Sequence, residues 1–273
     1  MKIINIKSGE PYDVYCGRAN KYLNLPKSKW HNPFWMESER DRPDVLNKFE
    51  AYLETRKDLI DSLWELDDKR AACYCWPKDC HLGILKKKRQ EQLENLSKTW
   101  NYPIKNGVLG FRRGFLSQWH GAYKGQSGSF WINNLRYNCV EQFHMAQKAL
   151  LFNSQEDFEK IIVEKDPKNQ QILGRKIKNF DQETWDKEKL QILRYGNLCK
   201  FDQNEDLKLL LLQTGNLILT EASKDMIYGC GFEEGDERMF EPEKWEGKSL
   251  LGSVLMEVRE AIKNKLTNEK AVV

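Results

Sequence analysis

The segment Cys139 to Phe152, CVEQFHMAQKALLF, constrains the fold of this chain more than any other. Its apolar residues recur at helical spacing, and neither Gly nor Pro interrupts them. Glu141, His144 and Lys148 are spaced at i, i+3 and i+7, which places them on one face of a helix. Taken alone, such a face is most often solvated, because charged residues are rarely fully buried. The segment therefore predicts one helix whose polar face has to be explained by the rest of the chain.

Charge and cysteine content narrow the class of protein. The chain has 273 residues with 44 basic and 41 acidic side chains. Its net charge of +3 is too small to indicate, by itself, a surface that binds nucleic acid. Seven cysteines follow an N-terminus without an apolar leader. No apolar run approaches the ~20 residues that a membrane-spanning helix needs. We therefore expect a cytoplasmic protein with free thiols and no membrane partner.

The order of predicted elements indicates an α+β fold in two domains. Residues 1–95 read as a small accessory α/β domain, with strands at the N-terminus and at Tyr12–Cys16, helices in Pro43–Leu66 and a buried strand at Ala71–Trp76. Residues 96–106 read as a linker. The following domain, 107–266, is mainly helical with a few short strands, and 267–273 form a flexible tail. Helical patterns in this second domain occupy 139–152, 155–164, 182–196, 205–213 and 249–264.

The first domain resembles a small uncharacterised family of bacteria and their viruses. The resemblance rests on YDVYCGR, WHNPF and CYCWPKDCHLGIL, and it implies no activity. The family's usual Trp-Gly-Asn-Pro-Phe has His31 in place of Gly. Two hypotheses for this domain stay open. Arg18, Asn32 and His81 could line a phosphate or nucleotide pocket at the carboxyl edge of the strands, or they could be structural.

A cysteine-rich stretch lies in the same domain. Cys73, Cys75, Cys80 and His81 are metal ligands by type, but their spacing differs from the paired C-x₂₋₄-C knuckles of structural zinc sites. Cys80 and His81 are adjacent, so their side chains are expected to diverge. We therefore expect buried thiols here and no metal.

Four sequence blocks carry the candidate chemistry of the second domain. They are the 139–152 segment, FDQETWD from Phe180, TEASKDMIYGCG from Thr220 and GKSLLGSVLMEVR from Gly247. Together with LGR, GN..KF.QN and L..TG between them, they closely resemble the NADAR (YbiA-like) family over about residues 108–264. The resemblance implies an N-glycosidase. Members of that family are associated with ribosylamine intermediates of riboflavin synthesis and with ADP-ribose on modified nucleobases, notably guanine in DNA.

N-glycosidic cleavage develops an oxocarbenium ion at the ribose, which carboxylates can stabilise while an acid or base handles the leaving nitrogen and the water. The resemblance implies that Glu141 is the essential helix glutamate and that Asp225 is the acid after the E-[AS]-S turn. It implies that Trp185 packs on the substrate. Which carboxylate activates water stays open. The structural alternatives are a turn cap for Asp225 and a core position for Trp185.

Further residues are candidates for substrate binding. Lys148 could pair with Glu141 or bind phosphate, and Gly229 and Gly231 would let backbone approach a ligand. Arg175, Lys200 and, at the start of the last helix, Ser249 are phosphate candidates. The remaining candidates lie in motifs where the chain departs from the family's pattern: Ser117, Gln118, Trp119 and Tyr228. The departures at Gln118 and Ser249 bear on substrate choice, whereas Tyr228 in place of the family's Trp preserves aromatic stacking.

The sequence therefore predicts an N-glycosidase without cofactor or metal. Its expected substrate is an ADP-ribosylated nucleobase such as guanine, with DNA as a carrier. A phosphorylated ribosylamine of riboflavin biosynthesis is the alternative substrate. A sensor that binds ADP-ribose or a nucleotide without turnover is the alternative function, although a binding module has no need of two carboxylates beside an anionic ligand.

Overall fold

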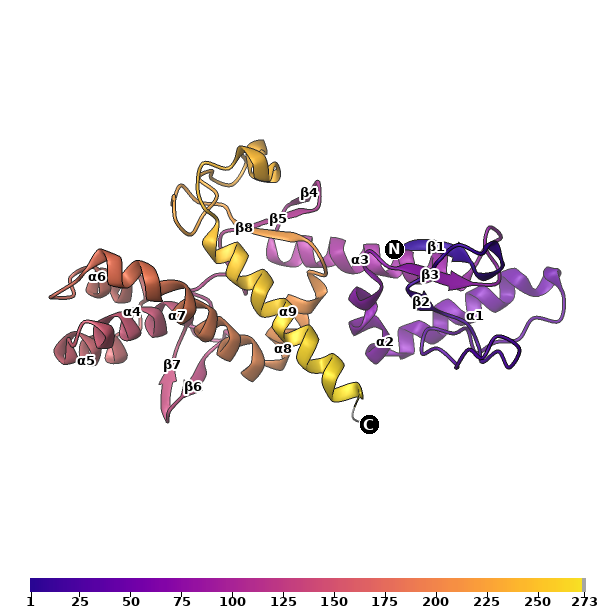
Figure 1. Ribbon diagram of the computed structural model, residues 1–273, viewed down its shortest axis with the longest axis horizontal. Coiled ribbons are helices and arrows are strands. Elements are labelled where there is room, and N and C mark those ends of the chain that lie inside the picture. The colour runs from indigo at the N-terminus through magenta and orange to yellow at the C-terminus, as the bar shows by residue number, and fades with distance from the viewer. Residues whose placement is uncertain (272–273) are drawn as a thin grey trace. The chain divides into compact units, whose positions relative to one another are not determined.

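The computed structural model describes residues 1–271 and divides them into two compact units. The N-terminal unit contains Met1–Leu96 together with Gln213–Asn216, and the C-terminal unit contains the rest. Helices dominate, and three small sheets accompany them, which confirms the α+β prediction (Figure 1). The expected linker begins inside helix α3 (His81–Trp100), and the expected tail begins inside helix α9 (Leu250–Ala271). Residues 272–273 lie outside the described part of the chain.

The N-terminal unit is built on a parallel sheet with strand order β1-β3-β2. Its strands are β1 (Lys2–Asn5), β2 (Val14–Tyr15) and β3 (Arg70–Cys73). The central strand β3 is buried from Ala71 to Cys73, as expected for a parallel strand covered on both faces. Helices α1 (Arg42–Thr55), α2 (Lys57–Asp61) and α3 accompany the sheet. The predicted small α/β arrangement is thus present.

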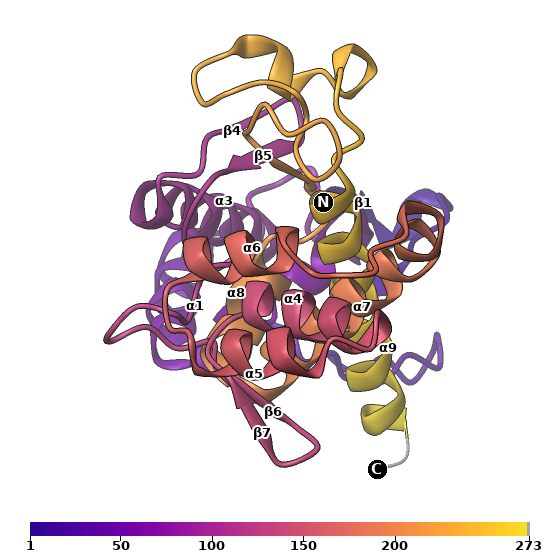
Figure 2. The ribbon, with the colours of Figure 1, turned by 90° about the vertical axis from the view of Figure 1, so that its left-hand side faces the viewer.

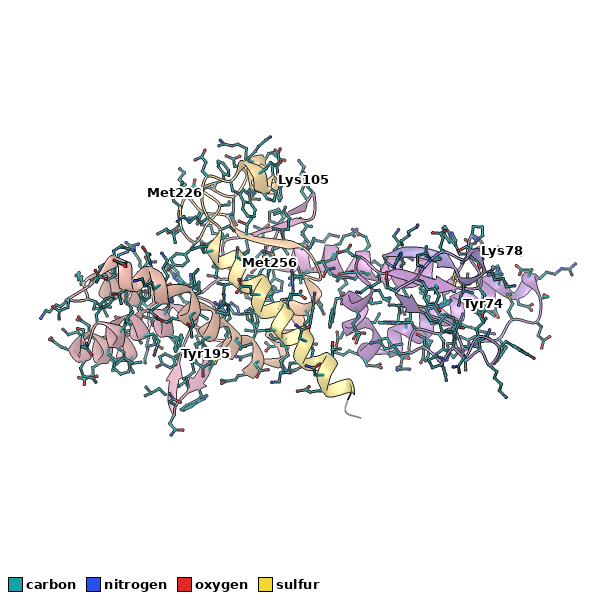
Figure 3. All side chains as sticks on the ribbon, in the orientation of Figure 1. Tyr74, Lys78, Lys105, Tyr195, Met226 and Met256 are labelled. Atoms are coloured by element: carbon teal, nitrogen blue, oxygen red, sulfur yellow. The ribbon has the colours of Figure 1, made fainter. Side chains whose placement is uncertain are left out.

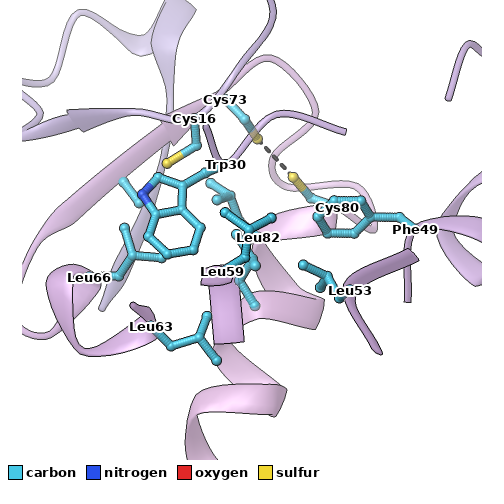
Figure 4. Close-up of a cluster of buried hydrophobic side chains, with 12 residues drawn as sticks. Cys16, Trp30, Phe49, Leu53, Leu59, Leu63, Leu66, Cys73, Cys80 and Leu82 are labelled. Carbon is cyan, nitrogen blue, oxygen red and sulfur yellow. Dashed lines mark hydrogen bonds between the residues drawn. The ribbon is translucent and has the colours of Figure 1, made fainter. Parts of the chain in front are cut away.

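A cluster of buried side chains forms the core of this unit (Figure 4). Trp30, Phe49 and Leu53 pack there with leucines of the segment after α1, and Leu82 and Leu85 of α3 are buried with them. The apolar positions of Pro43–Leu66 therefore face the core as their helical spacing predicts. The same cluster includes the thiols of Cys16, Cys73 and Cys80.

Six helices form most of the C-terminal unit. They are α4 (Val140–Leu151), α5 (Gln155–Val163), α6 (Pro167–Arg175), α7 (Gln182–Gln203), α8 (Glu205–Gln213) and α9. Helix α4 packs against α5, α6 and α7, as the end-on view shows (Figure 2). Helix α6 was not predicted from periodicity. Its start signals are local: Asp166 caps the backbone N–H of Lys168, and Pro167 takes the first position.

Two small sheets complete this unit. Strands β4 (Ile104–Lys105), β5 (Val108–Phe111) and β8 (Ile218–Glu221) form one sheet in the order β4-β5-β8. Strands β5 and β8 are parallel, with Phe111 opposite Glu221 at their carboxyl ends. An antiparallel hairpin is formed by β6 (Phe130–Ile132) and β7 (Leu135–Tyr137).

Short 3-10 turns lie between these elements, at Ile6–Ser8, Glu39–Asp41, Leu63–Leu66, Glu237–Phe240 and Pro242–Lys244. All seven cysteines are free thiols. Among the described residues, no helix is both long enough and apolar enough to cross a membrane.

Candidate active site

A cavity of about 760 Å³ opens at the carboxyl ends of the parallel strands β5 and β8. Its walls come from four places: the segment after β5, the first turn of α4, the end of α6 and the loop after β8. Parallel strands end at the same edge of a sheet, and loops that leave that edge commonly form a binding crevice. Segments more than a hundred residues apart in sequence therefore meet at one site.

Helix α4 places Glu141 in the wall of this cavity. The predicted helix is present, but its polar face is buried, with only 4% of Glu141 and 1% of His144 exposed. Burial raises the pKa of Glu141 to about 7, and the negative charge of Glu221 adds to this rise. A hydrogen bond with the Trp119 side chain and the positive charge of Arg175 act in the opposite direction. Near neutral pH, Glu141 can therefore either donate or accept a proton.

Glu221 is a second carboxylate of the cavity that the sequence analysis missed. It ends β8, and burial together with the charge of Asp225 raises its pKa to about 7. The Ser223 hydroxyl donates to it at 3.3 Å. One signal was available in the sequence, because Glu221 lies within TEASKD, four residues before Asp225. The parallel pairing of β5 and β8, which places Glu221 at the cavity, cannot be recognised from the sequence around Glu221.

Asp225 lies in the loop after β8, the loop that carries Met226 in Figure 3. Its Oδ1 accepts the backbone N–H groups of Ile227 and Tyr228 at 2.8 and 2.7 Å. Asp225 thus does cap a turn, and it also lines the cavity at an exposed position. Tyr228 lines the cavity beside it, with its hydroxyl 3.2 Å from Nε2 of His144.

Three arginines give the cavity a basic wall. Arg112 and Arg113 follow β5 directly, and Arg175 ends α6. All three are exposed, as anion-binding side chains at a cavity mouth should be. Arg175 was a candidate from sequence, whereas Arg112 and Arg113 were missed. Two adjacent arginines directly after the short apolar segment Val108–Phe111 are the signal that could have identified them.

The segment 115–120 forms another wall of the cavity. It contains Ser117, Gln118 and Trp119, which were candidates for substrate binding and all line the cavity. Its backbone is tied to α4, because the carbonyl of Gln118 accepts the N–H of Glu141 at 3.1 Å. Within the described part of the chain, Oε1 of buried Gln118 has no hydrogen-bond partner, and neither has Nδ1 of buried His120. Both residues line the cavity. Buried polar atoms without a partner are uncommon, so their presence marks this wall as a place where a ligand can bind.

Lys200 is not a phosphate ligand as the sequence analysis expected. It is completely buried in α7, and its Nζ donates to the carbonyls of Phe115 and Ser117 at 2.7 and 2.9 Å. Burial lowers the pKa of Lys200 to about 7. Lys200 therefore positions the wall segment that carries Gln118 and Trp119, and it does so from behind the cavity.

We expect Lys200→Met to destabilise the C-terminal unit by about 2–4 kcal/mol, because the carbonyls of Phe115 and Ser117 lose their donor inside the protein. Thermal unfolding followed by circular dichroism measures this loss. The matched control is Lys187→Met on the same helix. That lysine is 68% exposed and pairs only with Glu183, so its loss should cost less than about 1 kcal/mol. Equal effects of the two changes would contradict the positioning role.

Trp185 and Lys148 lie outside the cavity wall. Trp185 is 7% exposed and packs against the His144 ring, with centroids 4.9 Å apart. Lys148 makes no ion pair with Glu141 among the described contacts. Its Nζ instead donates to the carbonyl of Gly174 at 2.9 Å and sits 4.2 Å from the centroid of the Phe180 ring. Lys148 lies about two helical turns beyond Glu141 on α4, and Trp185 packs against α4 from α7, so both side chains support α4 outside the cavity.

Gly229, Gly231 and Ser249, which were candidates for substrate binding, instead make close contacts within the protein. A Cβ at Gly229 would meet the Ser223 hydroxyl at 2.1 Å, and one at Gly231 would meet the backbone N of Gly247 at 2.9 Å. Ser249 is 1% exposed and shares a hydrogen bond of 2.8 Å with Thr220. These residues close the loop after β8 upon itself, and none of the three lines the cavity.

Comparison with known proteins places this geometry in a family. The model of the NADAR domain matches residues 110–263, which is more than half of the chain and includes every residue of the cavity wall. The chain belongs to the NADAR domain family. A second model, described as a domain of unknown function (DUF4326), matches residues 4–91.

Two curated relatives of this NADAR chain carry the name N-glycosidase. N-glycosidase R617 of Acanthamoeba polyphaga mimivirus is 41% identical over 157 residues, which cover 52% of this chain and 92% of the relative. N-glycosidase Npun_R5314 of Nostoc punctiforme is 31% identical over 50% of this chain and 81% of its own length. Among solved structures, the NMR structure of E. coli YbiA matches with a TM-score of 0.49 and 24% identity, over 61% of this chain and 90% of that one.

Proposed function

We propose that this chain hydrolyses an N-glycosidic bond, and that its substrate is an ADP-ribosylated nucleobase such as guanine, carried by DNA. The observation that carries the proposal is the composition of one cavity. Three carboxylates (Glu141, Glu221 and Asp225) share it with three arginines and with the aromatic side chains of Trp119, Tyr123 and Tyr228. Carboxylates suit an oxocarbenium ion, arginines suit a pyrophosphate and aromatic rings suit a stacked base.

The proposed reaction breaks the bond between C1′ of the ribose and a nitrogen of the base. The bonding electron pair leaves with that nitrogen, which takes a proton from an acid of the enzyme. The oxygen of a water molecule adds to the cationic C1′, and a base of the enzyme takes the water's proton. One acid and one base are required, and the sum of protons on the enzyme is unchanged after turnover.

Glu141 and Glu221 are our candidates for this acid–base pair. Their pKa values are both raised to about 7, and the charge of Glu221 contributes to the rise at Glu141. Near neutral pH such a coupled pair holds about one proton, so one member can protonate the leaving nitrogen while the other accepts from water. Asp225 stands apart at the cavity mouth, held by two backbone N–H groups, and we assign it to stabilising the positive charge at C1′.

The size and charge of the cavity favour ADP-ribose over the smaller alternative. Ligand cavities commonly measure about 300–1,000 Å³, and 760 Å³ lies in the upper part of that range. Arg112 and Arg113 on one wall and Arg175 on another offer more cationic groups than a single phosphate monoester needs. A ribosylamine phosphate of riboflavin biosynthesis remains the alternative substrate, and binding without turnover the alternative function.

A direct comparison of substrates tests the proposal. The purified full chain is given an oligonucleotide with ADP-ribosylated guanine and, separately, a phosphorylated ribosylaminopyrimidine, and the products are followed by mass spectrometry. We expect free ADP-ribose from the first and no hydrolysis of the second. Hydrolysis of the second alone would support the alternative substrate. Binding of ADP-ribose with no hydrolysis of either would support the sensor.

The acid–base pair predicts a bell-shaped pH dependence of kcat/KM with its maximum near pH 7. Below the raised pKa values both glutamates are protonated, so the base is lost. Above them both are ionised, so the acid is lost. Rates measured from about pH 5 to about pH 9 test this prediction, and Glu221→Gln should abolish one limb of the bell. A profile that stays flat through neutrality would exclude the pair.

A further inference from the structure

Three cysteines of the N-terminal unit bring their sulfur atoms into one small volume. Cys73 ends β3, Cys75 follows two residues later and Cys80 directly precedes α3. The Sγ atoms of all three lie within 4.8 Å of one another. Those of Cys73 and Cys80 are 2.8 Å apart and point toward each other (Figure 4). The side chains of the adjacent Cys80 and His81 were expected to diverge, but Sγ of Cys80 lies 3.6 Å from Nδ1 of His81. The chain between Cys75 and Cys80 returns Cys80 to the end of β3.

This arrangement fits the coordination geometry of zinc. A tetrahedral zinc ion has Zn–S distances of about 2.3 Å, which place two ligand sulfurs about 3.8 Å apart. The three sulfurs lie close enough together to share one such ion after small shifts, and the Cys73–Cys80 pair would have to open by about 1 Å. Thiolate ligands select zinc among the common divalent ions, because hard cations such as magnesium prefer oxygen.

Neighbouring groups would support thiolates at this position. Nε2–H of His81 donates to the carbonyl of Cys16, 2.8 Å away, while Nδ1 of the same ring lies 3.6 Å from Sγ of Cys80. The positively charged Arg42 lines the same cavity as Cys75. Donors and oriented rings around the ligands are the usual outer shell of metal sites.

The cluster also faces open space. Cys73, Cys75 and Cys80 line a cavity of about 320 Å³ at the carboxyl ends of the parallel strands, and Arg18 and Arg42 line it with them. A three-thiolate set leaves one tetrahedral position, and here that position would face the cavity, as in zinc sites that keep a water or a ligand. We propose that Cys73, Cys75 and Cys80 bind one zinc ion whose fourth position opens into this cavity.

Metal content of the full-length protein tests the proposal. The reduced protein is incubated with zinc sulfate, desalted and analysed by inductively coupled plasma mass spectrometry. We expect about one zinc ion per chain. Cys75→Ser should lower this stoichiometry at least about tenfold, because it removes one of three ligands while changing a half-buried side chain. Cys199→Ser is the matched control, since Cys199 is also a half-buried free thiol but lies on α7 of the C-terminal unit, and it should keep the full stoichiometry.

A second measurement separates metal binding from folding. Cobalt(II) added to the reduced protein should produce a thiolate-to-metal charge-transfer band, and that band should be lost in Cys75→Ser while its circular dichroism matches the unchanged protein. If reduced protein takes up neither zinc nor cobalt, the proposal is wrong. It is also wrong if Cys75→Ser binds zinc as fully as the control. A Cys73–Cys80 disulfide in protein that binds no metal after reduction would assign the cluster to redox chemistry instead.

Discussion

Glu141→Gln is expected to reduce the release of ADP-ribose by about 10³-fold or more, because the amide can neither give nor take the proton that the reaction requires. Glutamine has nearly the same shape as glutamate, so the packing of α4 should persist. Product release measured by mass spectrometry under single-turnover conditions gives the rate of the chemical step. Turnover within about tenfold of the unchanged protein would remove Glu141 from the mechanism.

A control in the same unit distinguishes loss of the catalytic group from loss of any negative charge. Glu205→Gln changes an exposed carboxylate in the first turn of α8, outside the cavity lining, and should leave the rate unchanged. Binding of free ADP-ribose to Glu141→Gln should persist, because the arginines of the cavity are intact. Loss of both binding and turnover would instead indicate that the site had collapsed.

The Glu141→Gln variant should also be more stable than the unchanged protein at alkaline pH. The pKa of Glu141 is raised from 4.5 to about 7, so the folded state holds its proton more tightly than the unfolded chain does. The unchanged protein therefore loses stability as the pH rises from about 4.5 to about 7, and the variant avoids that loss because its amide does not titrate. At about pH 8 the difference in unfolding free energy should approach about 3 kcal/mol, and near pH 4 it should vanish. Chemical denaturation at both pH values measures it.

The second large effect is expected at Gly252, where α9 crosses β8. A Cβ at this position would lie 1.9 Å from the carbonyl oxygen of Leu219 and 2.7 Å from its carbonyl carbon. Because those atoms are backbone of the strand, no side chain can move aside. Gly252→Ala should therefore destabilise the C-terminal unit by about 3 kcal/mol and lower its melting temperature by roughly 10 °C. Activity should fall as well, since β8 carries Glu221 to the cavity.

Gly83→Ala is the control for the effect of the added methyl group itself. Gly83 also lies in a helix, α3, but nothing stands within 4 Å of a Cβ built there. Alanine should stabilise that helix by about 0.5–1 kcal/mol, because glycine loses more backbone entropy on folding. Calorimetric melting of both variants tests the pair of predictions. A mild effect at Gly252, comparable in size to that at Gly83, would mean that α9 can shift away from β8.

Local sequence pattern was sufficient to predict the helices and strands whose buried residues recur at regular intervals or form a short apolar run. The helix at 139–152 could be predicted because its apolar residues repeat at helical intervals, and the central strand of the N-terminal unit because it is short and continuously apolar. Helix α6 and strand β8 were missed. The first is marked by an Asp–Pro start more than by periodicity, and the second is four residues long.

The sequence by itself determined the family of this chain, the helix that carries Glu141 and the loop that carries Asp225, because ordered motifs and local periodicity encode them. Only the tertiary structure decided which side chains share a cavity. Glu221, Arg112 and Arg113 enter it because β5 and β8 pair in parallel and end together, a pairing across about a hundred residues that no local pattern records. Lys200 and Trp185 do not line the cavity. The Lys200 ammonium is hydrogen-bonded to the backbone carbonyl of Phe115, and the Trp185 ring packs on His144 inside the protein. The polar face of α4 is buried for a related reason: its neighbours, and not its own spacing, exclude water from it.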